Sequence, residues 1–237
     1  VGCAGAFEDR AKATSRAVAE LLHTAGVSFA VLGDGESCTG DPARRAGNEL
    51  LYQMLAAANV EALAAAEARR IVVTCAHCFN TLKREYPQLG GRYDVVHHTE
   101  LLDPLVRAGR LPPLAPLPDA AGTVTYHDPC FLGRHNEIYL PPRDLLGAAG
   151  AVPVEMARAG ERGLCCGGGG ARVWMEETRG TRIATERATE ALGTGAARIV
   201  TACPFCTVML TDGVAAAGGT AEVVDVATVL LESVRRA

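Results

Sequence analysis

Short apolar runs alternate with longer segments of helical periodicity along the 237 residues of this chain. The apolar runs predict strands at residues 27–32, 71–74, 93–96, 123–126, 152–155, 199–201 and 222–224. Ala-rich or Leu-rich segments between them predict helices, of which 10–22, 44–58 and 179–192 are examples. Alternation of strand and helix is typical of an α/β fold, in which a parallel sheet carries helices on both faces.

The dipeptide Asp41-Pro42 indicates where one of these helices begins. Aspartate is a favourable N-cap because its carboxylate accepts hydrogen bonds from free backbone N–H groups. Proline fits the first helical position because that residue needs no N–H partner. We therefore expect Asp41 to cap a helix.

The chain carries two copies of one pattern, and its cysteines mark both copies. Four cysteines recur at an offset of 127 or 128 positions, in the pairs Cys3 and Cys130, Cys38 and Cys165, Cys75 and Cys203, and Cys78 and Cys206. Neighbouring residues follow the same offset, since Arg70-Ile71-Val72 recurs as Arg198-Ile199-Val200. A self-match at a fixed period indicates duplicated structural units. We call residues 1–112 the first repeat and residues 113–237 the second repeat.

A proline-rich stretch, residues 109–122, is predicted to link the repeats, because proline cannot continue a helix or a central strand. In the second repeat, the strand predicted at 123–126 leads into Cys130. In the first repeat, only Val1 and Gly2 precede Cys3. The first strand of the first repeat is therefore expected to be missing, as in a chain cut from a longer polypeptide.

The composition disfavours several classes of protein. Lys and Arg number 23 against 27 for Asp and Glu, a formal charge of −4, whereas a nucleic-acid partner needs a basic face. No apolar run reaches the roughly 18 residues that a membrane helix needs. Nine cysteines are an odd number, and disulfide scaffolds are usually short secreted chains. Metal or redox chemistry is therefore the expected use of the cysteines.

The Cys-x-x-Cys pairs follow predicted strands and precede helical patterns. In open α/β sheets the ligand crevice lies beyond the carboxyl ends of the strands, and helix N-termini stabilise thiolates. Pro204 in the second pair fits the first turn of a helix. Cysteines within one repeat can therefore converge, whereas cysteines of different repeats need not meet.

The whole pattern resembles the cysteine-rich CCG domain of heterodisulfide reductase and its relatives, which include the iron–sulfur subunits of glycolate and lactate oxidation. The second repeat has the full signature of Cys130, Cys165-Cys166-Gly167 and Cys203-Pro204-Phe205-Cys206. In the first repeat, Cys38-Thr39-Gly40 replaces Cys-Cys-Gly. The segments 37–42 and 126–130 also resemble a subgroup of large bacterial iron–sulfur reductases. In that subgroup the repeats follow a membrane part and a ferredoxin-like domain.

The resemblance implies two tandem Rossmann-like repeats with parallel sheets, related by a pseudo-two-fold axis, and a four-iron cluster in each repeat. The expected ligands are all nine cysteines: Cys3, Cys38, Cys75, Cys78, Cys130, Cys165, Cys166, Cys203 and Cys206. Four cysteines suit a cubane 4Fe–4S cluster in the first repeat. The fifth cysteine of the second repeat allows a non-cubane cluster there, with Cys165 and Cys166 as catalytic residues.

Other residues near the cysteines are candidates for contact with the cofactor. Glycines let the backbone approach a bulky cluster and donate N–H groups to its sulfurs, which points to Gly40, Gly167 and Gly168. Arg172 and His127 complete the predicted set of cofactor-binding residues. His77, His97, His98 and His135 lie near cysteines or strand ends, and a structural role is the more common one for such histidines.

The family implies electron transfer in a membrane-associated oxidoreductase at the cytoplasmic face of a bacterial plasma membrane. The implied partners are an electron-transfer flavoprotein, quinone, and ferredoxin-like and membrane domains of the same longer polypeptide. Thiol–disulfide reduction at the second cluster is an alternative activity. A zinc-stabilised interaction module is a different class of function, because four thiolates also suit tetrahedral zinc. Ligands spread over 76 positions and a fifth cysteine favour iron–sulfur over zinc.

Overall fold

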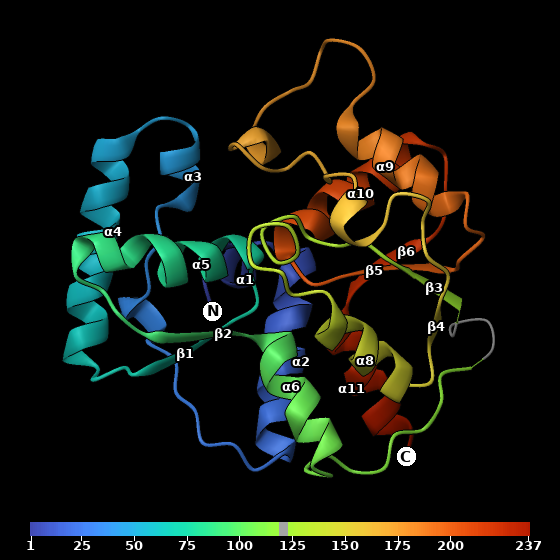
Figure 1. Ribbon diagram of the computed structural model, residues 1–237, viewed down its shortest axis with the longest axis horizontal. Helices are drawn as coiled ribbons and strands as arrows, with labels where there is room; N and C mark the ends of the chain where they lie inside the picture. Colours follow the sequence, from blue (N-terminus) through green and yellow to red (C-terminus); the bar gives the residue numbers. More distant parts are fainter. Residues whose placement is uncertain (119–122) are drawn as a thin grey trace.

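The computed structural model describes residues 1–118 and 123–237. The last four residues of the predicted linker, 119–122, therefore lie outside the described part of the chain. Residues 112–118 form no helix or strand. The α/β architecture with parallel sheets is confirmed (Figure 1).

The sheet of the second repeat has four parallel strands in the order β4-β3-β5-β6. These are β3 (Thr123–Tyr126), β4 (Val152–Pro153), β5 (Arg198–Thr201) and β6 (Glu222–Asp225). The central strand β5 carries Ile199, Val200 and Thr201, which are all buried although successive side chains face opposite sides. The sheet is therefore covered on both faces, as the sequence predicts.

The described sheet of the first repeat has two parallel strands, β1 (Arg70–Val73) and β2 (Asp94–His97). The strand predicted at 27–32 is wrong, because these residues form no strand and are mostly exposed. In the second repeat β3 lies between β4 and β5, whereas the described part of the first repeat has no strand in that place. A segment without a hydrogen-bonded neighbour cannot form part of a sheet.

A cavity of about 80 Å³ lies along β1, between that strand and the segment around Leu32. Its walls include Ile71 and Val73 of β1, and it ends at Cys75 and Cys78.

The helices of the first repeat are α1 (Cys3–Phe7), α2 (Asp9–Thr24), α3 (Asp41–Arg45), α4 (Glu49–Ala65), α5 (Ala76–Asn80) and α6 (His98–Arg107). The helix predicted at 44–58 is in fact divided between α3 and α4. Asn48 separates them, because its side chain accepts a hydrogen bond from the Leu51 N–H at 3.1 Å and so caps α4.

The predicted capping role of Asp41 is wrong. Gly40 is the N-cap of α3 and has a left-handed φ of 82°, and no side chain caps that helix. The Asp41 carboxylate instead accepts hydrogen bonds from Arg45 and Thr81 and contacts the ring of His77. Tertiary partners therefore outcompete the local cap.

The helices of the second repeat are α8 (Leu140–Ala148), α9 (Ile183–Leu192), α10 (Pro204–Ala216) and α11 (Val226–Arg236). The helix predicted at 179–192 begins four residues late, at Ile183. Its backbone N–H donates to Glu177 at 3.1 Å, which holds the preceding loop in place.

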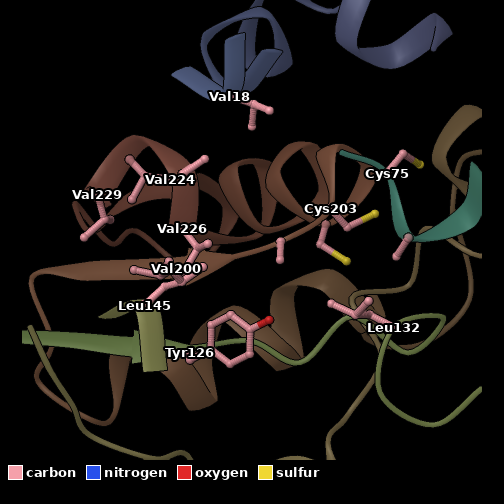
Figure 2. Close-up of a cluster of buried hydrophobic side chains, with 14 of the residues drawn as sticks. Val18, Cys75, Tyr126, Leu132, Leu145, Val200, Cys203, Val224, Val226 and Val229 are labelled. Carbon is pink, nitrogen blue, oxygen red and sulfur yellow. The ribbon is translucent and has the colours of Figure 1, made fainter. Parts of the chain in front are cut away.

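Two equivalent pairs of helices join the repeats. Helix α2 packs against α11, and α6 packs against α8. The offset of about 127 residues relates α2 to α8 and α6 to α11, so each pair is the pseudo-two-fold image of the other (Figure 1). Figure 2 shows the core beside this interface, where Val18 of α2 belongs to the same buried cluster as Val226 and Val229 of α11.

Within the described ranges, no helix has both the length and the apolar character needed to cross a bilayer.

Candidate functional site

The cysteines of the second repeat converge beyond the carboxyl ends of its strands. Cys203 follows β5 and is the N-cap residue of α10, and Cys206 lies in the first turn of that helix. Each thiol shifts the pKa of the next one along a chain from Cys130 to Cys165, on to Cys166, then to Cys206 and Cys203, so neighbouring thiols lie close together. All five cysteines predicted for one cluster therefore meet in one place.

The four cysteines of the first repeat form two contacting pairs in the same geometry. Cys75 follows β1 and is the N-cap of α5. Its thiol contacts Cys78, and the Cys3 and Cys38 sulfurs lie 3.9 Å apart. The Thr39 hydroxyl is 3.6 Å from the Cys78 sulfur. Thr39 therefore occupies the place that Cys166 occupies beside Cys206 in the second repeat.

The two sets of thiols touch each other. The thiols of Cys75 in the first repeat and Cys203 in the second lie close enough to shift each other's pKa, and both residues are buried (Figure 2). The sequence pattern did not require these two cysteines to meet, because they are 128 positions apart and belong to different repeats. Packing of the repeats therefore makes one continuous site out of two.

Both sets contain the same glycine turn. Gly40 and Gly167 have φ values of 82° and 86°. Each donates its backbone N–H to the cysteine sulfur two positions earlier, at 3.4 Å to Cys38 and 3.3 Å to Cys165. The left-handed turn is nearly free for glycine and strained for other residues. It supplies an N–H donor to a cysteine sulfur in each repeat, and the predicted contact of these glycines with a cofactor stays a prediction.

Two other residues predicted to bind the cofactor, Gly168 and Arg172, differ in their distance from the cysteines. Gly168 lies against Cys166, since a Cβ there would be 3.7 Å from its sulfur. Arg172 is half exposed and pairs with Glu177 at 3.1 Å. Its predicted role at the cofactor stays a prediction.

The thiols share protons unequally. A hydrogen bond from Cys3 lowers the pKa of Cys38 to about 6, against the effect of burial. Bonds from Cys130 and Cys166 lower the pKa of Cys165 far below its usual value, while the bond to Cys165 raises the pKa of Cys130. Crowded thiols that favour partial deprotonation suit a cationic metal group.

His127 stands at the second set of thiols. One of its ring nitrogens lies within 4.8 Å of the Cys166 and Cys206 sulfurs. The ring is fully buried, and Arg187 donates from Nε to its Nδ1 at 3.1 Å. Burial and, after it, the nearby Arg187 guanidinium lower the pKa of His127 to about 4. The imidazole is therefore neutral at ordinary pH.

His77 lies between the two sets of thiols. Its Nδ1 is 2.8 Å from the Asp41 carboxylate, and its ring contacts Phe131 and Phe205 of the second repeat. Burial opposes charge on this ring, but Asp41 and the Cys203 thiol outweigh it and raise the pKa of His77. The ring thus joins the two repeats beside the cysteines.

The other histidines differ in exposure. His97 caps α6 and bonds the Ala202 carbonyl at 3.1 Å, and His98 bonds Asp225 at 3.0 Å. Both histidines have structural partners across the interface between the repeats. His135 is exposed and stacks on Phe131.

The donor set fits an iron–sulfur cluster in each repeat. It contains four and five cysteines, which are the ligands that such clusters take, and backbone N–H groups that point at the sulfurs. A structural zinc site takes four ligands in a closed tetrahedron, which leaves the fifth thiol of the second set without a role. The sequence reasoning missed Arg187 and Asp41 as residues that contact this site.

The comparisons with known proteins agree with this geometry. A family model described as the cysteine-rich domain CCG matches residues 1–83 and again residues 124–211. The chain is 47% identical over 238 residues to the EtfAB:quinone oxidoreductase of Syntrophomonas wolfei, with 97% of this chain covered. It is 44% identical over 237 residues to the probable iron–sulfur-binding oxidoreductase FadF of Bacillus subtilis, with 99% covered.

A further relative belongs to the dihydromethanophenazine:CoB–CoM heterodisulfide reductase of Methanosarcina acetivorans. The relevant polypeptide of that enzyme is 37% identical over 221 residues and covers 90% of this chain. The chain spans 33% of the length of the first two relatives and 52% of the third.

Proposed function

This chain belongs to the cysteine-rich CCG domain family, whose relatives are iron–sulfur oxidoreductase components, and from that premise we propose that it relays electrons through two four-iron clusters. Residues 1–112 and 113–237 each hold one cluster. The observation that carries the proposal is the contact between Cys75 and Cys203. Ligands that touch bring two clusters close enough for electrons to pass between them.

The two clusters differ in kind. Cys3, Cys38, Cys75 and Cys78 hold a cubane cluster in the first repeat. Thr39 cannot replace a thiolate, so that set has four ligands. The five cysteines of the second repeat hold a cluster with one more thiolate, of the non-cubane type.

The protein supplies ligands, N–H donors and a dry environment. Gly40 and Gly167 donate to sulfurs of the two sets, and such bonds favour the more negative, reduced state of a cluster. Burial of Cys75 and Cys203 keeps water away from the contact between the sets. When bound, the clusters supply one-electron chemistry.

The second set is the reactive end of the relay. Cys165 is only partly buried, and the glycine-rich loop beside it gives a partner close access. Cys165 is therefore the thiol that the substrate or the next electron carrier can reach, and the buried Cys166 completes the reactive pair behind it. Arg172 and His127 are the predicted residues around them.

The donor is an electron-transfer flavoprotein and the final acceptor is quinone, in keeping with the name of the Syntrophomonas relative. Ferredoxin-like and membrane domains of a longer polypeptide are the other parts of this enzyme. A relative named as a probable membrane-anchored ferredoxin supports their presence. The cytoplasmic face of a bacterial plasma membrane is the proposed location.

Metal content tests the clusters directly. We expect about eight irons and labile sulfide per chain after anaerobic reconstitution, with absorbance near 400 nm. About two zinc ions with no sulfide would refute the cluster proposal and favour a non-redox interaction module.

A second assay tests the relay. Reduced electron-transfer flavoprotein and a quinone analogue are mixed anaerobically with the 237-residue chain or with the full-length enzyme in membranes. We expect the chain to accept electrons from a strong reductant without reducing quinone, and the full-length enzyme to couple the two. Quinone reduction by the chain alone would refute the relay.

Disulfide reduction at the second cluster is a second candidate. It is favoured by the fifth thiol, which is present only in the second set, and by the heterodisulfide reductase relative. The same reduced chain, offered a mixed disulfide of two small thiols, would then release both thiols as two electrons and two protons are added.

A further inference from the structure

We infer that Arg187 locks His127 into the tautomer that donates its Nε2–H to a sulfur of the second cluster site. His127 is thereby a hydrogen-bond donor to that site and not a ligand of its iron. This inference rests on the proposed function only in naming the sulfurs as part of a cluster.

The tautomer follows from the chemistry of arginine. A guanidinium has five N–H donors and no acceptor, so Nδ1 of His127 must accept the bond from Arg187 through its lone pair. Nδ1 then carries no proton. A neutral imidazole has one ring proton, which must sit on Nε2.

The same reasoning excludes His127 as a metal ligand. Metal coordination at Nε2 needs a lone pair there, and the ring proton would have to move to Nδ1, where Arg187 donates. The proximity of His127 to the Cys166 and Cys206 sulfurs, within 4.8 Å, therefore fits a donor to the cluster site and not a ligand of its iron. Among the described residues, Nε2 of His127 has no hydrogen-bond partner although it is buried. The acceptor that we infer for this N–H is a sulfur of the bound cluster site, whose Cys166 and Cys206 sulfurs lie within 4.8 Å of the ring.

Arg187 is held firmly in this role. Its side chain is fully buried, and its Nη1 donates to the Arg158 carbonyl and to Glu190, each at 2.8 Å. The His127 backbone N–H donates to the Val200 carbonyl at 2.8 Å, which fixes the ring at the end of β3. Neither partner can turn away without breaking buried hydrogen bonds.

The position of Arg187 in the helix is itself unusual. It lies on the buried stripe of α9, together with Ala184, Ala188 and Ala191. A charged residue at such a position is rare unless it is paired. Here the pairing with Glu190 offsets the charge and leaves Nε free to orient the histidine. Arg187 is thus a positioning residue that acts through His127.

The first test uses the unaltered protein. The chain is labelled with ¹⁵N-histidine, loaded with iron and sulfide, and reduced by one electron per cluster. Pulsed EPR then measures the nitrogen coupling to the second cluster, with H127F to assign the signal. We expect a weak coupling, as for a hydrogen-bonded nitrogen. A strong coupling, as for a coordinated nitrogen, or no coupling from His127 would overturn the inference.

The second test measures the reduction potential of the second cluster in R187M. Loss of the lock frees the ring to move its proton to Nδ1, which removes the N–H bond to sulfur. We expect the ratio of reduced to oxidised second cluster to fall about tenfold at a fixed ambient potential, which is about 59 mV for one electron. The first cluster in the same sample is an internal reference.

R158M is the matched control. This substitution removes one positive charge and a guanidinium that also pairs with Glu190. The Arg158 side chain is not a hydrogen-bond partner of His127. We expect the potential of its second cluster to be unchanged. The double variant H127F/R187M separates the effect of Arg187 on the tautomer from the effect of its charge. If Arg187 acts through His127, R187M should change the reduction potential of the second cluster little once H127F is present. Fully additive shifts would overturn the inference.

The outcomes distinguish this inference from the proposed function. Failure to bind iron and sulfide in the unaltered chain refutes the clusters themselves. Normal loading with the wrong nitrogen coupling refutes only the role of His127. A strong nitrogen coupling can be detected in the unaltered chain alone. The inference can therefore be refuted even if R187M does not fold.

Discussion

Alanine at Gly167 should weaken the second cluster and leave the first intact. Gly167 has a φ of 86°, which costs a residue with a Cβ roughly 1–2 kcal/mol. The new Cβ would also lie 3.1 Å from Cβ of Ile183, so α9 must give slightly. The turn that aims the Gly167 N–H at Cys165 is therefore strained by about 2 kcal/mol, which corresponds to roughly a thirtyfold loss of affinity.

The assay is anaerobic removal of iron by a chelator, followed separately for each cluster by its spectrum. We expect the second cluster of G167A to lose iron at a roughly thirtyfold lower chelator concentration, if the whole strain opposes binding. G169A is the control, because Gly169 has no left-handed φ and a Cβ added there would meet no heavy atom within 4 Å.

The equivalent change in the first repeat should reverse the pattern. A Cβ at Gly40 would lie 2.9 Å from the Tyr52 ring and 3.2 Å from its backbone carbonyl, so G40A should weaken the first cluster and spare the second. Equal loss of both clusters in G167A, or the same loss in G169A, would refute a local role for the glycine turn.

Three further predictions follow from the same geometry. C166T should give the second cluster the spectrum of the first while much of its iron remains, and T39C should do the reverse; unchanged spectra would show that Cys166 is not a ligand. C165S should abolish turnover in the intact enzyme, measured as quinone reduction, and full activity would move the reactive centre elsewhere. G213A should lower the free energy of unfolding by about 1–3 kcal/mol, because its Cβ meets a backbone carbonyl of α9. G147A, at an open helical position, should be neutral or slightly stabilising in the same denaturant titration.

The repeats and most of the strands are readable from the sequence. Buried strands such as β5 are continuous apolar runs because both faces are covered, and their signal is local. The position of each Cys-x-x-Cys at a helix N-terminus is equally local, since Pro204 directly marks the first turn of α10. The cysteine offsets carry the family assignment without any coordinates.

Local patterns fail where a distant partner decides the outcome. The apolar run at 27–32 has the composition of a strand, but the described part of the chain places no strand beside it to complete its hydrogen bonds. Asp41 is a residue type that favours the N-cap position. Its carboxylate instead contacts His77 and accepts a hydrogen bond from Thr81, which both lie far along the chain. In both cases the competing or missing interaction lies outside any short window of sequence.

The sequence by itself determined which thiols each repeat supplies, because their spacing follows directly from the strands and helices around them. Only the tertiary structure decided that Cys75 meets Cys203, and that Arg187 orients His127. Those contacts join residues 128 and 60 positions apart. They depend on how α2 and α6 pack against α11 and α8, and on how α9 packs against α10. Packing of this kind depends on side-chain shape across elements, which periodicity along one element does not record.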